Sequence, residues 1–216
     1  MQVHFSKIAT AAALAFAAAL PLTASATVVT FDDVLPNSQA NPYAIPNGYG
    51  GLNWNNLNVL QASHSLYTNT GYRHGLVSGS YVAYNLQGNP AGALAVSSAT
   101  TFDFNSAYLT AAWSKNLNID VQGFRNGSLL YTQTIVVSDE AATLFNFNYL
   151  GIDQLKFVSY GGINSGNSGS GSHFALDNFT YNETAHVPEP ATLSLLGLGL
   201  IGFGVARRKS KQGKNA

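Results

Sequence analysis

The sequence contains no cysteine and few charged residues. Without cysteine, the chain cannot form disulfides, a thiolate nucleophile, a zinc–thiolate site or an iron–sulfur cluster. Charged residues make up 9% of the 216 residues, whereas a typical soluble domain carries about 25%. The surface must therefore rely on neutral polar side chains, which is more typical of exported proteins than of cytosolic ones.

Positive charge is scarce everywhere except at the C-terminus. Five of the ten basic residues lie in the last ten positions, and residues 27–187 carry four basic and nine acidic residues. A nucleic-acid-binding surface needs a cationic stripe that neutralises phosphates. The mildly acidic body therefore excludes nucleic acid as an expected partner.

Residues 1–26 have the features of a secretory signal peptide. Lys7 precedes an apolar run over residues 8–20, Pro21 follows it, and Ala24-Ser25-Ala26 provides small residues at a cleavage site. A membrane anchor is the alternative, but the apolar run is short and has no charged cluster after it. We therefore predict cleavage by signal peptidase, with a mature chain that begins near Thr27.

Residues 185–216 contain three parts in a fixed order. Val187-Pro188-Glu189-Pro190 comes first, the apolar stretch Ala191–Ala206 follows, and Arg207-Arg208-Lys209 comes last. This stretch of 16 residues spans about 24 Å as a helix at about 1.5 Å per residue. We predict a transmembrane sorting helix whose basic end stays on the cytoplasmic side.

This order resembles the PEP-CTERM sorting signal of exported bacterial proteins, a tail that is also labelled an ice-binding protein C-terminal domain. The resemblance implies that exosortase, a membrane-embedded protease-transpeptidase, recognises Pro188, Glu189 and Pro190, with Arg207 and Arg208 as the stop. It also implies transient anchoring in the inner membrane and a final position at a cell surface or matrix rich in exopolysaccharide.

The body, residues 27–184, is predicted to be all-β. Runs of β-branched and aromatic residues alternate with Gly, Asn, Ser and Pro clusters, and no helical period is sustained. So many strands in one domain indicate a two-sheet sandwich or a jelly-roll-like domain. The predicted strands are Thr27–Phe31, Gly51–Trp54, Tyr81–Leu86, Ala93–Val96, Thr100–Phe104, Tyr108–Trp113, Leu117–Phe124, Ser128–Val137, Thr143–Phe147, Gln154–Ser159 and His173–Tyr181.

The strongest local signal is a hairpin. Leu117, Ile119 and Val121 alternate with polar residues, and Asn126-Gly127 favours a type I′ turn before the returning strand.

Residues 161–172, rich in Gly and Ser, predict a long mobile loop, which is either a lid over a ligand or a tolerated surface insertion.

Three aspartates are candidate metal ligands. Asp32 and Asp33 end the first predicted strand, and Asp177 lies in the last one, where the alternation slips and predicts a bulge. If these strands are neighbours, the carboxylates form a structural Ca²⁺ site. The body is also similar to carbohydrate-binding-module-like sandwiches, in which terminal strands hold such an ion, although no complete motif matches. The alternative is that the aspartates cap turns.

No spacing of His, Ser or acidic residues matches a catalytic motif, so we expect a noncatalytic protein. Tyr43, Tyr49 and Trp54 lie among Asn residues, and sugars stack on exposed aromatic rings while amides bind their hydroxyls. Carbohydrate binding or adhesion is the expected function. A structural matrix component without a ligand is the alternative, and a polysaccharide hydrolase or an ice-binding protein is less favoured.

Overall fold

The computed structural model describes residues 26–34, 42–88 and 94–182. The predicted signal peptide and sorting tail lie outside these residues. The strands are β1 (Thr27–Val29), β2 (Tyr43–Ala44), β3 (Asn53–Asn55), β4 (Leu57–Leu60), β5 (Val82–Asn85), β6 (Leu94–Ala111), β7 (Ser114–Arg125), β8 (Ser128–Val137), β9 (Thr143–Asn164) and β10 (Phe174–Tyr181), with two 3₁₀ turns, η1 (Tyr49–Gly51) and η2 (Ser65–Tyr67), and one short helix, α1 (Gly71–His74).

The strands form one antiparallel sheet in the order β2-β4-β5-β10-β6-β9-β7-β8, with β1 added to β10 and β3 to β6. The all-β prediction is confirmed, but hydrogen bonds join the strands into a single sheet instead of two. The reason lies in β6 and β9, which pair along most of their length through several register shifts. These irregularities bend the two strands and interrupt the alternation of apolar and polar residues. Five of the predicted strands are therefore segments of only two strands, β6 and β9.

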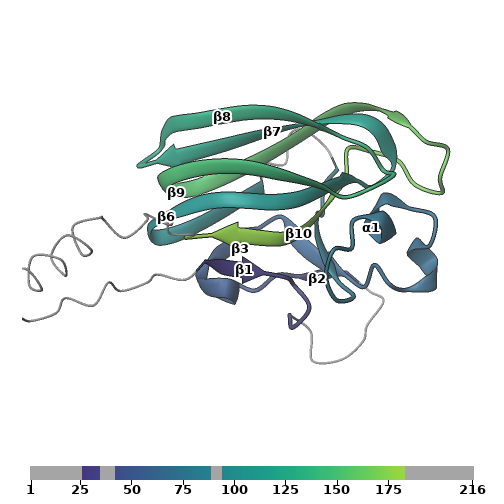
Figure 1. Ribbon diagram of the computed structural model, residues 1–216, viewed down its shortest axis with the longest axis horizontal. Helices are drawn as coiled ribbons and strands as arrows, with labels where there is room; N and C mark the ends of the chain where they lie inside the picture. The colour runs from purple at the N-terminus through teal and green to yellow at the C-terminus, as the bar shows by residue number, and fades with distance from the viewer. Residues whose placement is uncertain (1–25, 35–41, 89–93, 183–216) are drawn as a thin grey trace, which may run out of the picture.

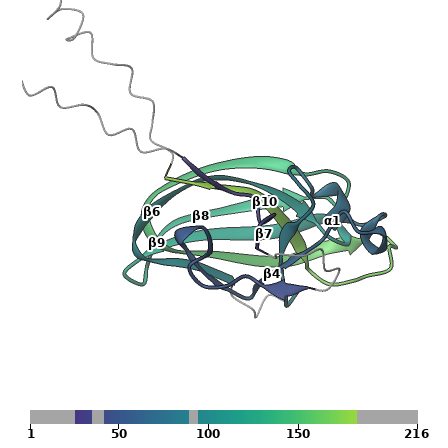
Figure 2. The same cartoon turned by 90° about the horizontal axis from the view of Figure 1, so that it is seen from below.

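The bent sheet folds over itself and encloses the core. Figure 1 shows β8, β7, β9 and β6 above β10 and the short strands of the N-terminal part, and in Figure 2 the strands run along the long axis of the molecule. Strands β9 and β10 are not neighbours in the sheet, yet the rings of Phe157 and Phe174 are 5.7 Å apart. Phe104 stacks on both Phe147 and Phe179, at 4.8 and 4.7 Å. The core therefore lies between two layers of one continuous sheet.

Local predictions with strong turn signals are confirmed. Strand β8 begins and ends at the predicted residues, and Asn126 and Gly127 have φ of 49° and 76°, as a type I′ turn requires. The first strand pairs with the last, with Thr27 opposite Tyr181. The predicted irregularity in the last strand lies between Asp177 and Thr180.

The predicted loop over residues 161–172 is too long, because β9 continues to Asn164 and pairs with β7. Gly161 and Gly162 belong to this strand with φ of 70° and 83°, a backbone conformation that glycine adopts without strain. A Cβ on Gly162 would come within 2.9 Å of the Ser114 Cβ. Glycine at this position therefore allows close pairing of two strands and does not mark the start of a loop.

Candidate functional site

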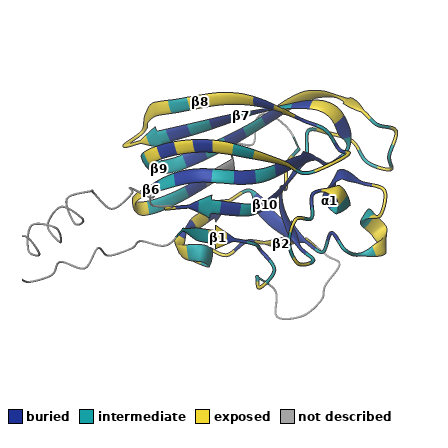
Figure 3. Ribbon diagram, viewed as in Figure 1, coloured by how far each residue is buried: buried dark blue, intermediate teal, exposed yellow. Residues whose placement is uncertain are grey.

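The outer faces of the two layers differ in exposure (Figure 3). Along β7, Leu117, Ile119 and Val121 are fully buried in the core, while the residues between them are partly exposed on the outer side. Strand pairing extends this outer side onto β8 and β9. We call this surface the open face, and its residues are Asn118, Asp120, Gln122, Phe124, Thr132, Thr134, Val136, Lys156, Val158 and Tyr160.

Asp120 lies at the centre of the open face. Thr134 on β8 donates a hydrogen bond of 2.7 Å to Asp120 Oδ1, and the Tyr160 hydroxyl on β9 donates one of 3.2 Å to the same atom. Among the described residues, none donates a hydrogen bond to Oδ2, and the residue is partly exposed. Residues on three strands thus hold one carboxylate in a defined orientation.

Amide, cationic and aromatic groups flank this carboxylate. Asn118 lies opposite Tyr160, and Gln122 lies opposite Lys156. The Lys156 ammonium is 4.7 Å from the centre of the Phe124 ring, a cation–π contact that holds the lysine side chain along the sheet. Tyr160 is 37% exposed. The open face therefore presents hydrogen-bond donors, hydrogen-bond acceptors and an exposed aromatic ring.

One of the three predicted ligand-binding aromatics is buried in the core. Tyr43 lies on β2 and is 52% exposed, whereas Trp54 is 6% exposed. The Trp54 ring packs edge-on against Phe31 and Phe179, and its Nε1 donates to the Tyr49 carbonyl at 2.8 Å. The prediction for Trp54 is wrong, because its ring is part of the core and has no face to offer a sugar.

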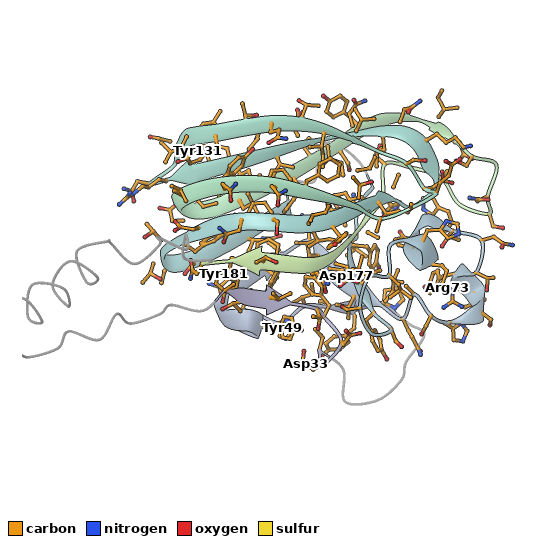
Figure 4. All side chains as sticks on the ribbon, viewed as in Figure 1. Asp33, Tyr49, Arg73, Tyr131, Asp177 and Tyr181 are labelled. Carbon is orange, nitrogen blue, oxygen red and sulfur yellow. The ribbon has the colours of Figure 1, made fainter. Side chains whose placement is uncertain are left out.

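Tyr49 is held by an aspartate. Its hydroxyl donates to Asp33 Oδ1 at 2.5 Å, and Figure 4 shows the two labelled side chains on the lower side of the molecule. Burial is the main cause that raises the pKa of Tyr49 above its usual range, and the bond to Asp33 adds to it. This contact fixes η1 against the first turn of the body.

The other two predicted metal ligands bind the backbone of one loop. Asp177 is fully buried and accepts hydrogen bonds from the amides of Val77 and Ser78 at 2.8 and 3.0 Å. Its second oxygen accepts from the Asn178 amide at 2.7 Å, while the Ser78 hydroxyl, 3.3 Å away, donates to Asn178 Oδ1 at 2.7 Å. Asp32 accepts from two later amides of the same loop, those of Ser80 and Tyr81. Turn capping therefore explains Asp32 and Asp177.

Backbone amides use most of the acceptor capacity of Asp177, because an ionised carboxylate has about four lone-pair sites and three N–H groups donate to it. Burial raises the pKa of Asp177, against the effect of these hydrogen bonds. In the part of the chain that the structure describes, no group of three or more His, Asp or Glu residues is placed to hold a metal ion. Calcium binding by Asp32, Asp33 and Asp177 stays a prediction.

The outer face of the other layer is covered. Leu60, Val82, Tyr84 and Ala175 on β4, β5 and β10 pack against Tyr72 of α1 and form a second buried cluster. The Tyr72 ring meets Tyr84 and Trp113 edge-on, at 5.5 and 5.3 Å. Burial strongly raises the pKa of Tyr72. We call this surface the covered face, and it acts as a second core.

Two of the histidines hold loops in place. Nδ1 of His74 lies 2.6 Å from the Asp139 carbonyl oxygen, and Nδ1 of His173 lies 2.8 Å from that of Asn85. The buried Asn85 side chain donates to Ser159 and to the Ser172 carbonyl and accepts from the Phe174 amide. These contacts tie the segment after β9 to both layers, so that segment is anchored at its C-terminal end.

Comparison with protein families adds a finding on the tail. Residues 186–209 match the PEP-CTERM protein-sorting motif. The motif implies export, a tail anchored in the membrane before processing, and processing by an exosortase. The predicted recognition and stop residues, Val187 to Pro190 and Arg207-Arg208, lie within this segment and outside the described residues. No helix among the described residues is long and apolar enough to cross a membrane.

No curated protein sequence matches the chain significantly. Among solved structures, the TmCBM61 module in complex with β-1,4-galactotriose is similar with a TM-score of 0.34 and 9% identity, over 60% of this chain and 85% of that one. The tandem CBM22 domains of Paenibacillus barcinonensis Xyn10C have a TM-score of 0.38 and 14% identity, over 76% and 47%. A family 16 carbohydrate-binding module has a TM-score of 0.33 and 14% identity, over 67% and 99%.

Proposed function

We propose that this exported protein binds polysaccharide at the bacterial cell surface, without catalysis, through the open face. The observation that supports the proposal is the carboxylate of Asp120, which Thr134 and Tyr160 orient on a partly exposed sheet surface. The tail motif supports a location outside the cytoplasm.

The chemistry of the open face suits sugars. Sugar hydroxyls donate to carboxylate and amide oxygens and accept from amide N–H groups, and Asp120, Asn118 and Gln122 offer all of these within one strand. The apolar face of a sugar ring packs on an aromatic ring such as that of Tyr160. Because the groups lie on adjacent strands of a rigid sheet, they lose little conformational freedom on binding.

The open face lacks the arrangement that glycoside hydrolysis requires. Most glycosidases use a pair of carboxyl groups on either side of the scissile bond, and Asp120 is the only carboxylate among the open-face residues. This supports the proposal of binding without cleavage.

The test is binding of the exported protein to a glycan array, followed by calorimetry with the oligosaccharides that bind. We expect saturable binding that Asp120→Ala and Gln122→Ala each weaken at least about tenfold, a loss of about 1.4 kcal/mol. The matched control is Asn146→Ala, an exposed amide on the first half of β9, away from the open face.

Three results would contradict the proposal. They are no saturable binding to any glycan, binding that survives both open-face substitutions, and release of reducing ends from a bound polysaccharide. The first favours a structural matrix component without a ligand, and the third favours a hydrolase.

A further inference from the structure

Strand β8 is the last strand of the sheet, and within the described ranges β7 is its only paired neighbour. Figure 1 shows it along the upper border of the molecule. Its outer edge therefore carries backbone N–H and C=O groups that no other described strand pairs. Such an edge is a template for another strand, and most proteins protect it with charged residues, proline or a bulge.

The sequence of β8, SLLYTQTIVV, contains no charged residue and no proline. A register shift opposite Gly123 and Phe124 places a bulge near Leu129 and Leu130, at the start of the strand. From Tyr131 to Val137 the pairing with β7 is regular. This seven-residue stretch lacks each of the usual protective features, although it forms the longest regular part of the edge.

The side chains along this stretch are also available for contact. Thr132, Gln133 and Thr134 are exposed, and Val136 is 54% exposed. The nearest charged group on the open face, Asp120, lies on β7, one strand away from the edge. A second strand can therefore approach β8 without burying an unpaired charge.

We propose that β8 pairs with β8 of a second copy of this chain, antiparallel and about a twofold axis at Thr134. This arrangement uses the whole regular stretch. It places Thr134 opposite the second copy's Thr134, Thr132 opposite Val136, and Gln133 opposite Ile135. Thr132, Thr134, Ile135 and Val136 are all β-branched, and β-branched residues are favoured in strands.

A second copy fits this edge because the stretch is complementary to itself. In antiparallel pairing, directly opposite residues share a face of the sheet, and a twofold axis at Thr134 pairs even-numbered residues with even-numbered ones. The even-numbered side chains Thr132, Thr134 and Val136 belong to the open face in each copy. The two open faces therefore join into one surface across the interface, and the odd-numbered side chains of the two copies meet on the opposite side of the sheet.

Disulfide trapping in the full chain tests the pairing directly, because the chain has no cysteine of its own. Thr134→Cys places two thiols opposite each other on the axis, where the Cα separation of about 4.5–5.5 Å fits a disulfide. We expect a covalent dimer of Thr134→Cys under mild oxidation.

Thr132→Cys is the matched control, on the same strand and face. Two copies of residue 132 would lie four residues apart along the strands, about 14 Å, too far for a disulfide. Alone it should stay monomeric, and mixed with Val136→Cys it should form a mixed dimer. Equal crosslinking of Thr132→Cys and Thr134→Cys, or crosslinking of Thr134→Cys only to another protein, would overturn the proposal.

Sedimentation velocity provides a second measurement that needs no oxidation. We expect the wild-type chain to form a dimer in a concentration-dependent way, and Thr134→Lys to sediment as a monomer because two ammonium groups would meet at the axis. Gln154→Lys, which adds the same charge on β9 away from the edge, should leave the dimer intact. Dimer formation by Thr134→Lys equal to that of the wild type would contradict the proposal.

Discussion

The open face and the covered face belong to the same sheet and differ in what lies outside them. Along β7, buried and partly exposed residues alternate, whereas every residue of β4 and β5 is buried. The segment that contains η2 and α1 folds over β4 and β5 and places Tyr72 on them. One outer face thus contributes to stability, and the other remains available for binding.

Substitutions at tyrosines on the two faces should separate these roles most strongly. Tyr72→Ala removes a buried ring from the covered face and should lower the free energy of unfolding by about 3–5 kcal/mol, as for other large aromatic truncations. Tyr160→Ala on the open face should cost less than about 1 kcal/mol and should weaken glycan binding. Urea unfolding measures the loss of stability for both variants. Equal losses would show that the two faces contribute equally to stability.

Aspartates give a second, smaller contrast. Asp177→Asn replaces one acceptor oxygen with an NH₂ group, which then faces backbone N–H donors, either those of Val77 and Ser78 or that of Asn178. Because two donors cannot bond to each other, we expect the free energy of unfolding to fall by about 2–3 kcal/mol. Asp120→Asn keeps one acceptor on the exposed side and should change stability by less than about 0.5 kcal/mol. Thermal unfolding distinguishes them, and a neutral Asp177→Asn would mean that the carboxylate does not hold the loop.

Alkaline pH should produce the smallest effect, and Tyr84 on the covered face contributes to it. Burial, with a contribution from Tyr67, raises the pKa of Tyr84 from 10.0 to about 12. Between these values the folded state keeps a proton that the unfolded state has lost, so stability falls as the pH rises. Tyr84→Phe should reduce this fall when urea unfolding is compared at pH 9 and pH 11. An unchanged slope would argue against a buried hydroxyl.

Features set by neighbouring residues were predictable from the sequence. The hairpin of β7 and β8 follows from the alternation after Leu117 and from Asn126-Gly127, which act over a few residues. By contrast, β6 and β9 were divided into five pieces, because bulges interrupt the alternation while hydrogen bonding continues. Strand β4 was missed, since a strand buried on both faces shows no alternation to detect.

The candidate site was less predictable, because it depends on contacts between distant segments. Asp177 binds amides about a hundred residues earlier in the chain, which no local pattern reveals. Trp54 was expected to bind a ligand since composition does not tell which side of a strand a ring occupies. Tyr160 was missed because it precedes two glycines that were interpreted as a loop, although the polar side of β7 had already been recognised.

Nuclear magnetic resonance of the side-chain amides tests the assignment of the binding face most directly. The exported protein is titrated with an oligosaccharide that it binds, and the NH₂ signals of asparagine and glutamine are followed. Our account predicts saturable shifts at Asn118 and Gln122 and none at Asn58, which lies on β4 and is 8% exposed. Shifts confined to Asn58 or to residues near Tyr43, with Asn118 and Gln122 unchanged, would contradict it.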